Sequence, residues 1–183
     1  MRITNIMIEI INNFFTEDKV LLFNNEIKKS NWKLNQTSVL SPARVERESS
    51  DNEIQYPAFW YNDIIHTDAL SLFTEEIKIR TGLNIEVLKL YSNGQAHGQC
   101  GFWHVDAPLG MNGYLTLVYF YKKWKPEYGG HLMIKNNEEV VSILPEYNTA
   151  VLLDSTMEHM GMEPTVHCKT QRESIACKFR IID

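Results

Sequence analysis

The chain contains 183 residues, of which 44% are hydrophobic, 11% aromatic and 22% charged, a balance typical of a globular protein with a full-sized core. This composition excludes an intrinsically disordered, collagen-like or coiled-coil protein. Eighteen basic residues against 23 acidic ones leave a net charge of −5, which disfavours polyanionic partners such as nucleic acids and anionic membranes.

The N-terminal half predicts one strand and two helices. The β-branched run at 6–11 favours a strand. A helix is expected from Thr16, whose hydroxyl can cap it, to about Lys29. A second helix should run from about Thr67 to Thr81 and end at Gly82, which suits a left-handed C-cap. The polar segment 35–56 between them predicts a surface loop or an irregular hairpin.

From residue 83 onward, short β-like runs follow one another with turn residues between them. They cover residues 85–91, 102–106, 114–121, 131–134, 139–143, 149–153 and 174–181. Such a series without a helical pattern is typical of a sandwich, a jelly roll or a barrel. We predict a single domain over residues 1–183, in which helical support from about 14 to 82 packs on a β core from about 83 to 183.

The cysteines and the N-terminus predict the compartment. Cys100, Cys168 and Cys177 are an odd number without a CxxC pair, so neither a disulfide framework nor a zinc ribbon is expected. Glu9 and several asparagines interrupt the apolar start of the chain, which argues against a signal peptide. No window approaches the roughly 18 apolar residues of a membrane span. We therefore expect a cytoplasmic protein without membrane contact.

The strongest local signal is the segment FWHVD at 102–106. Because side chains alternate between the faces of a strand, His104 and Asp106 should point the same way and can bind one metal ion. His159 follows another apolar strand, and an antiparallel sheet could return it to this pair. Two imidazoles and one carboxylate with open positions form the facial triad of non-haem Fe(II) oxygenases, whereas a structural zinc site uses four protein ligands.

A possible anion site follows on the next predicted strand. Thirteen residues after His159, Arg172 and Ser174 share one strand face, and a guanidinium there suits a bidentate carboxylate. The alternative is a surface arginine at the start of an edge strand, which is the commoner fate of a single arginine. His167 is a rival to His159 as a ligand, but it lacks a preceding apolar strand.

In their order, these motifs resemble the iron- and 2-oxoglutarate-dependent dioxygenases, specifically the prolyl 4-hydroxylase-like branch. The resemblance covers nearly the whole chain. It rests on INNFFTED (11–18) with Trp32, YSNGQ (91–95) before FWHVD, TLVYFYKKW (116–124), GGHL (129–132), where the family usually has Glu at His131, and His159 followed by Glu163-Pro164 and by Arg172 and Ser174. It implies a mainly β fold with N-terminal helices and a double-stranded β-helix (jelly-roll) core.

The resemblance also implies roles for the matching residues. The implied Fe(II) ligands are His104, Asp106 and His159. The implied 2-oxoglutarate-binding residues are Arg172, Ser174, Tyr119 and Tyr91. Tyr119 is favoured for the hydroxyl that completes the co-substrate site in the family, and counting from the other end of the matching strand leaves Phe120 as its alternative.

The activity implied by the resemblance is hydroxylation of an aliphatic C–H bond, for example of a prolyl residue, with release of succinate and CO2. O2 is the co-substrate, and ascorbate is an optional reductant. The expected substrate is a peptide or a small molecule. A nucleic-acid demethylase of the AlkB kind would want a basic groove and a second arginine six residues after the first, where this chain has Lys178.

Two alternatives stay open. A non-enzymatic metal- or carbohydrate-binding β-sandwich would carry the three ligand-type residues by coincidence or around a non-catalytic metal. A cupin-type metal enzyme would use the metal without 2-oxoglutarate, and Arg172 would then have no part in its activity. The sequence predicts no oligomeric state.

Overall fold

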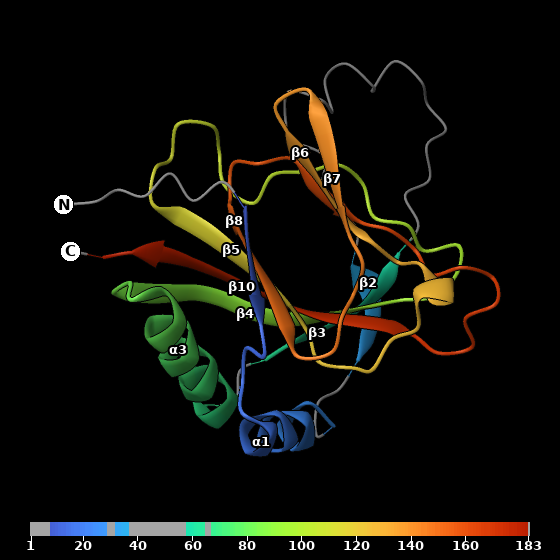
Figure 1. The fold of residues 1–183 in the computed structure, drawn as a ribbon, viewed down its shortest axis with the longest axis horizontal. Coiled ribbons are helices and arrows are strands. Elements are labelled where there is room, and N and C mark those ends of the chain that lie inside the picture. The colour runs from blue at the N-terminus through green and yellow to red at the C-terminus, as the bar shows by residue number, and fades with distance from the viewer. Residues whose placement is uncertain (1–7, 29–31, 37–57, 65–66, 183) are drawn as a thin grey trace.

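The computed structural model describes residues 8–28, 32–36, 58–64 and 67–182. Two antiparallel sheets, of seven and three strands, face each other, and the helices α1 and α3 cover the outer face of the larger sheet (Figure 1). The double-stranded β-helix expected from the resemblance is confirmed. Within the described ranges, neither helix is long and apolar enough to span a membrane.

The order of elements explains how distant segments meet. In chain order they are β1 (Ile8–Asn12), α1 (Glu17–Lys28), β2 (Lys33–Gln36), β3 (Phe59–Asp63), α3 (Thr67–Thr81), β4 (Ile85–Gln95), β5 (Tyr114–Phe120), a 3-10 turn (Pro126–Tyr128), β6 (Leu132–Asn136), β7 (Glu139–Ile143), β8 (Thr149–Asp154), β9 (His159–Gly161) and β10 (Arg172–Ile181). The larger sheet has the order β1-β8-β5-β10-β4-β3-β2, and the smaller sheet has the order β7-β6-β9.

Both helices begin and end close to where the sequence predicts. The Thr16 hydroxyl accepts a hydrogen bond from the backbone N–H of Lys19 (3.4 Å) at the start of α1, as expected of a capping residue. At the end of α3, Gly82 has φ +69° and its N–H donates to the carbonyl of Lys78 at 2.9 Å. The helix ends here because its C-terminal cap requires the left-handed conformation, which glycine adopts without steric cost.

The differences from the prediction concern short segments. The run at 102–106 makes a single β-bridge at His104 in place of a strand. The strands β2, β3 and β9 are not predicted, because they are short and partly polar, and pairing with neighbours defines them. Of the predicted loop at 35–56, residues 35 and 36 end β2 and the rest lies outside the described residues.

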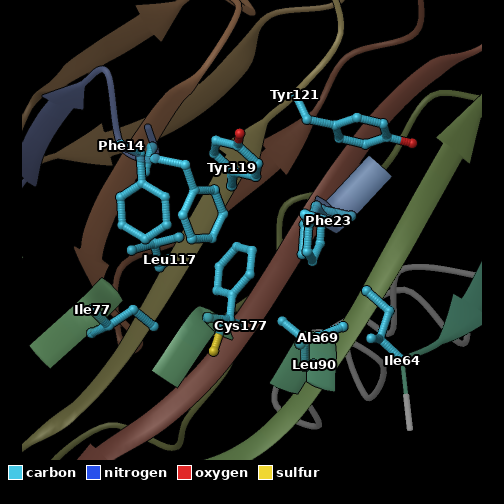
Figure 2. Close-up of a cluster of buried hydrophobic side chains, with 14 of the residues drawn as sticks. Phe14, Phe23, Ile64, Ala69, Ile77, Leu90, Leu117, Tyr119, Tyr121 and Cys177 are labelled. Carbon is cyan, nitrogen blue, oxygen red and sulfur yellow. The ribbon is translucent and has the colours of Figure 1, made fainter. Parts of the chain in front are cut away.

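Side chains of the larger sheet alternate between two apolar cores. One core lies between this sheet and the helices and includes Phe14, Phe23, Phe73, Leu117 and Tyr119 (Figure 2). The other lies between the two sheets and includes Val118, Phe120, Ile134, Val151 and Leu153. Because both faces of β5 are buried, its sequence YLTLVYF is almost entirely apolar.

Asn148 ties the segment before α1 to the first core. Its side chain accepts hydrogen bonds from Phe15 N–H (3.0 Å) and the Tyr119 hydroxyl (3.1 Å), and it donates to the Phe15 carbonyl (2.8 Å). Its φ of 57° lies in the left-handed region. Glycine in place of Asn148 can still adopt this left-handed conformation, but three buried polar groups lose their hydrogen-bond partner. We therefore expect the free energy of unfolding to fall by about 3 kcal/mol.

The matched control is Asn137→Gly, at a second asparagine with φ 57° that is exposed in the turn between β6 and β7. We expect this substitution to change stability by less than about 0.5 kcal/mol. Urea unfolding followed by circular dichroism measures both variants. Equal losses in the two would show that the Asn148 side chain adds nothing beyond its backbone conformation.

Candidate metal centre

A backbone bridge brings two histidines together that are 55 residues apart in the chain. His104 and His159 are antiparallel bridge partners whose N–H groups donate to each other's carbonyls at 3.1 and 2.9 Å. The N–H groups of Asp106 and Ala107 both donate to the carbonyl of Ser155, at 2.8 and 2.9 Å. The segment that carries His104 and Asp106 therefore runs alongside the turn and strand that lead to His159.

The three side chains converge on one point. One ligand atom from each of His104, Asp106 and His159 lies within 4.8 Å of the others. Nε2 of His104 is 3.7 Å from Asp106 Oδ1, and Nε2 of His159 is 3.5 Å from Asp106 Oδ2. Among the described residues, no other group of three histidine, cysteine or acidic side chains comes this close together.

Backbone carbonyls orient both imidazoles. His104 Nδ1 lies 2.7 Å from the Phe102 carbonyl, and His159 Nδ1 lies 2.9 Å from the Met157 carbonyl. Because a carbonyl only accepts, each Nδ1 donates to its carbonyl, and each Nε2 is turned toward the third residue, Asp106. Burial, and then the charge of His159, lower the pKa of His104 to about 4, so this imidazole is neutral at physiological pH.

The carboxylate of Asp106 is held on one side and lacks a hydrogen bond on the other. Oδ2 accepts a hydrogen bond from the Thr116 hydroxyl at 2.8 Å. Oδ1 is buried and lies 2.6 Å from Lys178 Nζ, but that contact does not have hydrogen-bond geometry. Burial raises the pKa of Asp106, but His159 and Lys178 outweigh it, so the pKa lies well below its usual range.

This donor set fits a divalent transition metal. One nitrogen from each imidazole and a buried carboxylate oxygen without a hydrogen bond face one another, which is the two-histidine, one-carboxylate arrangement that non-haem Fe(II) proteins use. The backbone bonds to both Nδ1 atoms and the Thr116 bond to Asp106 are the outer contacts that usually orient such ligands.

Arg172 begins β10 and is a buried cation without an acidic neighbour. It is 2% exposed, and its hydrogen bonds to described residues all end on neutral oxygens. They join Nε to the Gly130 carbonyl (2.5 Å) and one terminal nitrogen to Gln95 Oε1 (2.9 Å) and Ser174 Oγ (3.4 Å). No carboxylate in the described part of the chain forms an ion pair with it. Burial lowers the pKa of Arg172 to about 10, so the side chain stays charged and favours an anion.

Two glycines leave the room that this arginine occupies. A Cβ on Gly130, where φ is +72°, would lie 2.9 Å from Arg172 Cδ, and a Cβ on Gly161 would lie 3.4 Å from a terminal guanidinium nitrogen. Any side chain at Gly130 would also be strained by the positive φ. Gly130 belongs to the GGHL segment, so that turn serves to hold Arg172.

His104, Asp106 and His159, called the metal-type cluster below, line the same cavity as Arg172. This cavity has a volume of about 170 Å³. Its lining residues are Phe59, Tyr91, Asn93, Gln95, Gly101, His104, Val105, Asp106, Thr116, Val118, Leu132, His159, Gly161, Arg172, Ser174, Ala176 and Lys178. Burial and the nearby charge of Asp106 raise the pKa of Tyr91, so its phenol remains protonated and can donate a hydrogen bond. Seven residues were expected to bind the metal or the co-substrate, and all of them except Tyr119 line this cavity.

The profile of the 2OG-Fe(II) oxygenase superfamily matches residues 88–180, half of the chain. The chain belongs to this superfamily. It is a 2-oxoglutarate-dependent dioxygenase, and the family implies Fe(II) and 2-oxoglutarate with O2 as co-substrate. No curated protein sequence matches the chain.

Solved structures of 2OG-Fe(II) oxygenases are similar in fold. A prolyl hydroxylase from Trichoplax adhaerens, in complex with a hypoxia inducible factor peptide fragment, is 20% identical, with 97% of this chain and 84% of that chain covered and a TM-score of 0.66. A Pseudomonas putida prolyl-4-hydroxylase is 15% identical (96% and 93% covered, TM-score 0.61). HygX from Streptomyces hygroscopicus, with nickel, 2-oxoglutarate and hygromycin B bound, is 10% identical (95% and 82%, TM-score 0.61).

The structure does not place Tyr119 with the other residues expected to bind 2-oxoglutarate. Its side chain is fully buried in the core between the sheet and the helices, where its hydroxyl donates to Asn148. Figure 2 shows it among the rings of this core. The alternation of β5 turns the next residue, Phe120, to the other face, where the Arg172 guanidinium carbon lies 5.4 Å from its ring centroid. Of the two tyrosines expected in the oxygenase site, only Tyr91 lines the pocket.

A pair of tyrosine variants separates these two positions. Tyr119→Phe should leave the KM for 2-oxoglutarate unchanged and lower unfolding free energy by about 1 kcal/mol, through the loss of one buried hydrogen bond. Tyr91→Phe should raise that KM by about fivefold, because a donor is lost from the pocket. Succinate release at varied 2-oxoglutarate measures both. A raised KM in Tyr119→Phe alone would contradict the placement of the two side chains.

Sequence reasoning assigned no site role to three polar residues that line the oxygenase pocket. Thr116 holds Asp106, and Gln95 holds Arg172 while its Nε2 donates to the carbonyls of Gln99 and Gly161. Lys178 contacts Asp106. The alternation of β10 is a signal that could have found Lys178, since it shares a strand face with Arg172. Nothing local marks Thr116, which stands in an apolar strand.

Proposed function

We propose that this dioxygenase hydroxylates an aliphatic C–H bond, with His104, Asp106 and His159 binding Fe(II). Arg172, Ser174 and Tyr91 then bind 2-oxoglutarate. The observation that carries the proposal is that Arg172, buried and without an acidic partner among the described residues, lines the same small cavity as His104, Asp106 and His159. A non-catalytic metal module has no need of a desolvated guanidinium beside its metal, because a buried charge without a partner is costly.

The residues around the cavity have separable tasks. Arg172 neutralises the distal carboxylate of 2-oxoglutarate, and its fixed hydrogen bonds to Gly130 and Gln95 set its orientation. Ser174 and Tyr91 line the same cavity, and their hydroxyls add donors there. When bound, Fe(II) supplies the activation of O2, by which 2-oxoglutarate yields succinate and CO2 and the substrate gains one oxygen atom.

The apolar part of the lining excludes water. Val118 and Leu132 reach the cavity from the core between the two sheets. They place the metal ligands at the edge of a dry core, where charge interactions are stronger than in water. Thr116 keeps Asp106 in one rotamer through its hydrogen bond to Oδ2. The protein thereby orients the reactants and limits side reactions.

A prolyl residue of a peptide is the first substrate to test. The similar structures from Trichoplax adhaerens and Pseudomonas putida are prolyl hydroxylases, and the first holds a peptide fragment. HygX, which holds hygromycin B, has the same fold. Amino acids and other small molecules therefore belong in the same screen, since fold alone does not select the substrate.

The test has an anaerobic and an aerobic part. Adding Fe(II) and 2-oxoglutarate to the anaerobic protein should produce the visible charge-transfer band of a chelated keto acid. Under O2, succinate release is then measured with prolyl peptides, free amino acids and nucleosides, and we expect release to rise with a peptide or an amino acid. Absence of both the band and succinate would contradict the proposal, and iron binding without any effect of 2-oxoglutarate would favour a cupin-type enzyme.

A further inference from the structure

Two lysines stand side by side on the strand face that carries the site. The register of β10 and β4 pairs Lys178 with Lys89. Lys178 lines the same cavity as Arg172 and the metal-type cluster. Lys89 lies next to the lining rather than in it. Two adjacent ammonium groups on one strand face repel each other, so this arrangement is favourable only when negative charge lies nearby.

Both ammonium groups gather on the ring of Tyr91. Lys89 Nζ lies 4.8 Å and Lys178 Nζ 5.7 Å from the Tyr91 ring centroid, and Lys89 Nζ also lies 5.7 Å from the centroid of Tyr61. Aromatic faces attract cations but carry no charge to neutralise them. The rings therefore hold Lys178 at the cavity and Lys89 next to it, and they leave the charge of both to be balanced by another group.

The described residues offer each ammonium one acidic neighbour. Lys178 Nζ lies 2.6 Å from Asp106 Oδ1, and Lys89 Nζ lies 3.8 Å from Asp63 Oδ1. Asp63 also accepts a hydrogen bond from the Tyr61 hydroxyl. In the described ranges, no other carboxylate forms an ion pair with either lysine. Lys178 thus depends for its counter-charge on a residue of the candidate metal centre.

Metal binding changes this balance. With the proposed ligands and co-substrate in place, Asp106 and the two carboxylates of 2-oxoglutarate balance the charges of Fe(II) and Arg172. Lys178 then shares Asp106 with a dication and has no counter-charge of its own. Because its side chain is only 28% exposed, water compensates it incompletely. An anion that enters the cavity from solvent would restore the balance.

We propose that the substrate carries an anionic group, a carboxylate or a phosphate, which Lys178 and Lys89 bind beside the metal. This inference rests on the proposed function and names the substrate class of the same site. It predicts that a negative charge on the substrate increases affinity for the loaded protein. It also explains why a protein with a net charge of −5 pairs a second lysine, Lys89, with the lysine that lines its cavity.

The experiment uses protein loaded with Mn(II) and saturating 2-oxoglutarate under anaerobic conditions. Three probes are compared: N-acetylglycine, its neutral carboxamide N-acetylglycinamide, and methyl phosphate. Paramagnetic relaxation of the probe protons by Mn(II) reports binding close to the metal. We expect at least one anion to bind about fivefold more tightly than the amide, in the range of a partly exposed ion pair. Which anion is preferred distinguishes a carboxylate from a phosphate group.

Variants assign the effect to the lysines. Lys178→Met and Lys89→Met should each bring anion relaxation close to the level of the amide, and Lys178→Arg should retain it. Lys89 is the more exposed of the two, so its variant does not depend on a repacked cavity. Lys135→Met is the matched control, because Lys135 also pairs with an acid, Glu158, at 2.6 Å and lies over an aromatic ring, but that ring belongs to Trp103 and not to Tyr91.

Each outcome decides the inference. Equal relaxation of all three probes, or an anion preference that survives in both methionine variants, would overturn it. Failure of the wild-type protein to bind 2-oxoglutarate in the presence of Mn(II), measured beforehand by calorimetry, would overturn the proposed function itself. Normal 2-oxoglutarate binding without an anion preference would overturn the substrate inference alone.

Discussion

Replacing His159 with alanine is expected to abolish iron binding and succinate release. The side chain is 6% exposed, and its Nε2 faces Asp106. Among the described residues, no other histidine, cysteine or acidic side chain joins this group. Loss of a partner in the outer shell of a metal site already costs about 10- to 100-fold in affinity, and loss of a ligand should cost more. Metal content after dialysis against Fe(II) and the charge-transfer band measure the effect.

The control for this variant is His167→Ala. His167 is exposed and lies outside the cavity lining, so its loss should leave metal content and turnover unchanged. Near-ultraviolet circular dichroism checks that both variants keep their tertiary packing. Normal iron content in His159→Ala would contradict the role of His159 as a metal ligand. Loss of iron in His167→Ala would indicate that His167 is the ligand instead.

Replacing Arg172 with methionine should raise the KM for 2-oxoglutarate by on the order of 100-fold or more, since breaking a buried charge pair costs about 3–5 kcal/mol. The guanidinium is buried and makes its recorded hydrogen bonds to neutral oxygens only. Its removal from the free protein should therefore be almost neutral for stability, because no buried acid is left behind. Initial rates of succinate release and thermal melting measure the two effects.

Thermal melting adds a signature that a merely structural role would not produce. In the presence of Mn(II), 2-oxoglutarate should raise the Tm of the wild-type protein through preferential binding to the native state, and this rise should be lost in Arg172→Met. The control is Arg180→Met, on an exposed arginine of the same strand that pairs with Glu86. An unchanged KM in Arg172→Met would place the co-substrate elsewhere.

The motifs with a local cause could be predicted well. The cap at Thr16 and the left-handed Gly82 depend on hydrogen bonds and φ angles within a few residues, and the structure has both. The pairing of His104 with Asp106 on one side also follows from neighbouring positions in the chain, even though the backbone there makes only one β-bridge. Such local features do not depend on which distant segment packs against them.

The side of β5 that meets the cavity could not be predicted. In most antiparallel strands a polar face and an apolar face distinguish solvent from core, but YLTLVYF lies between two cores and has no such contrast. Alternation shows that Tyr119 and Phe120 point in opposite directions. It does not show which of the two side chains lies on the same side of the sheet as Arg172. This missing contrast is why the sequence favours Tyr119, although its side chain lies in the core against the helices.

The family resemblance carried by the order of motifs was therefore sufficient for the fold class and the superfamily, and it named the three side chains that the structure brings together. The register between strands far apart in the chain decided the rest: the meeting of His104 with His159, the position of Lys178 beside Lys89, and the face on which Tyr119 lies. The reason is physical. Periodicity and capping act over a few residues, whereas strand pairing and burial of both sheet faces are set by the packing of the whole chain.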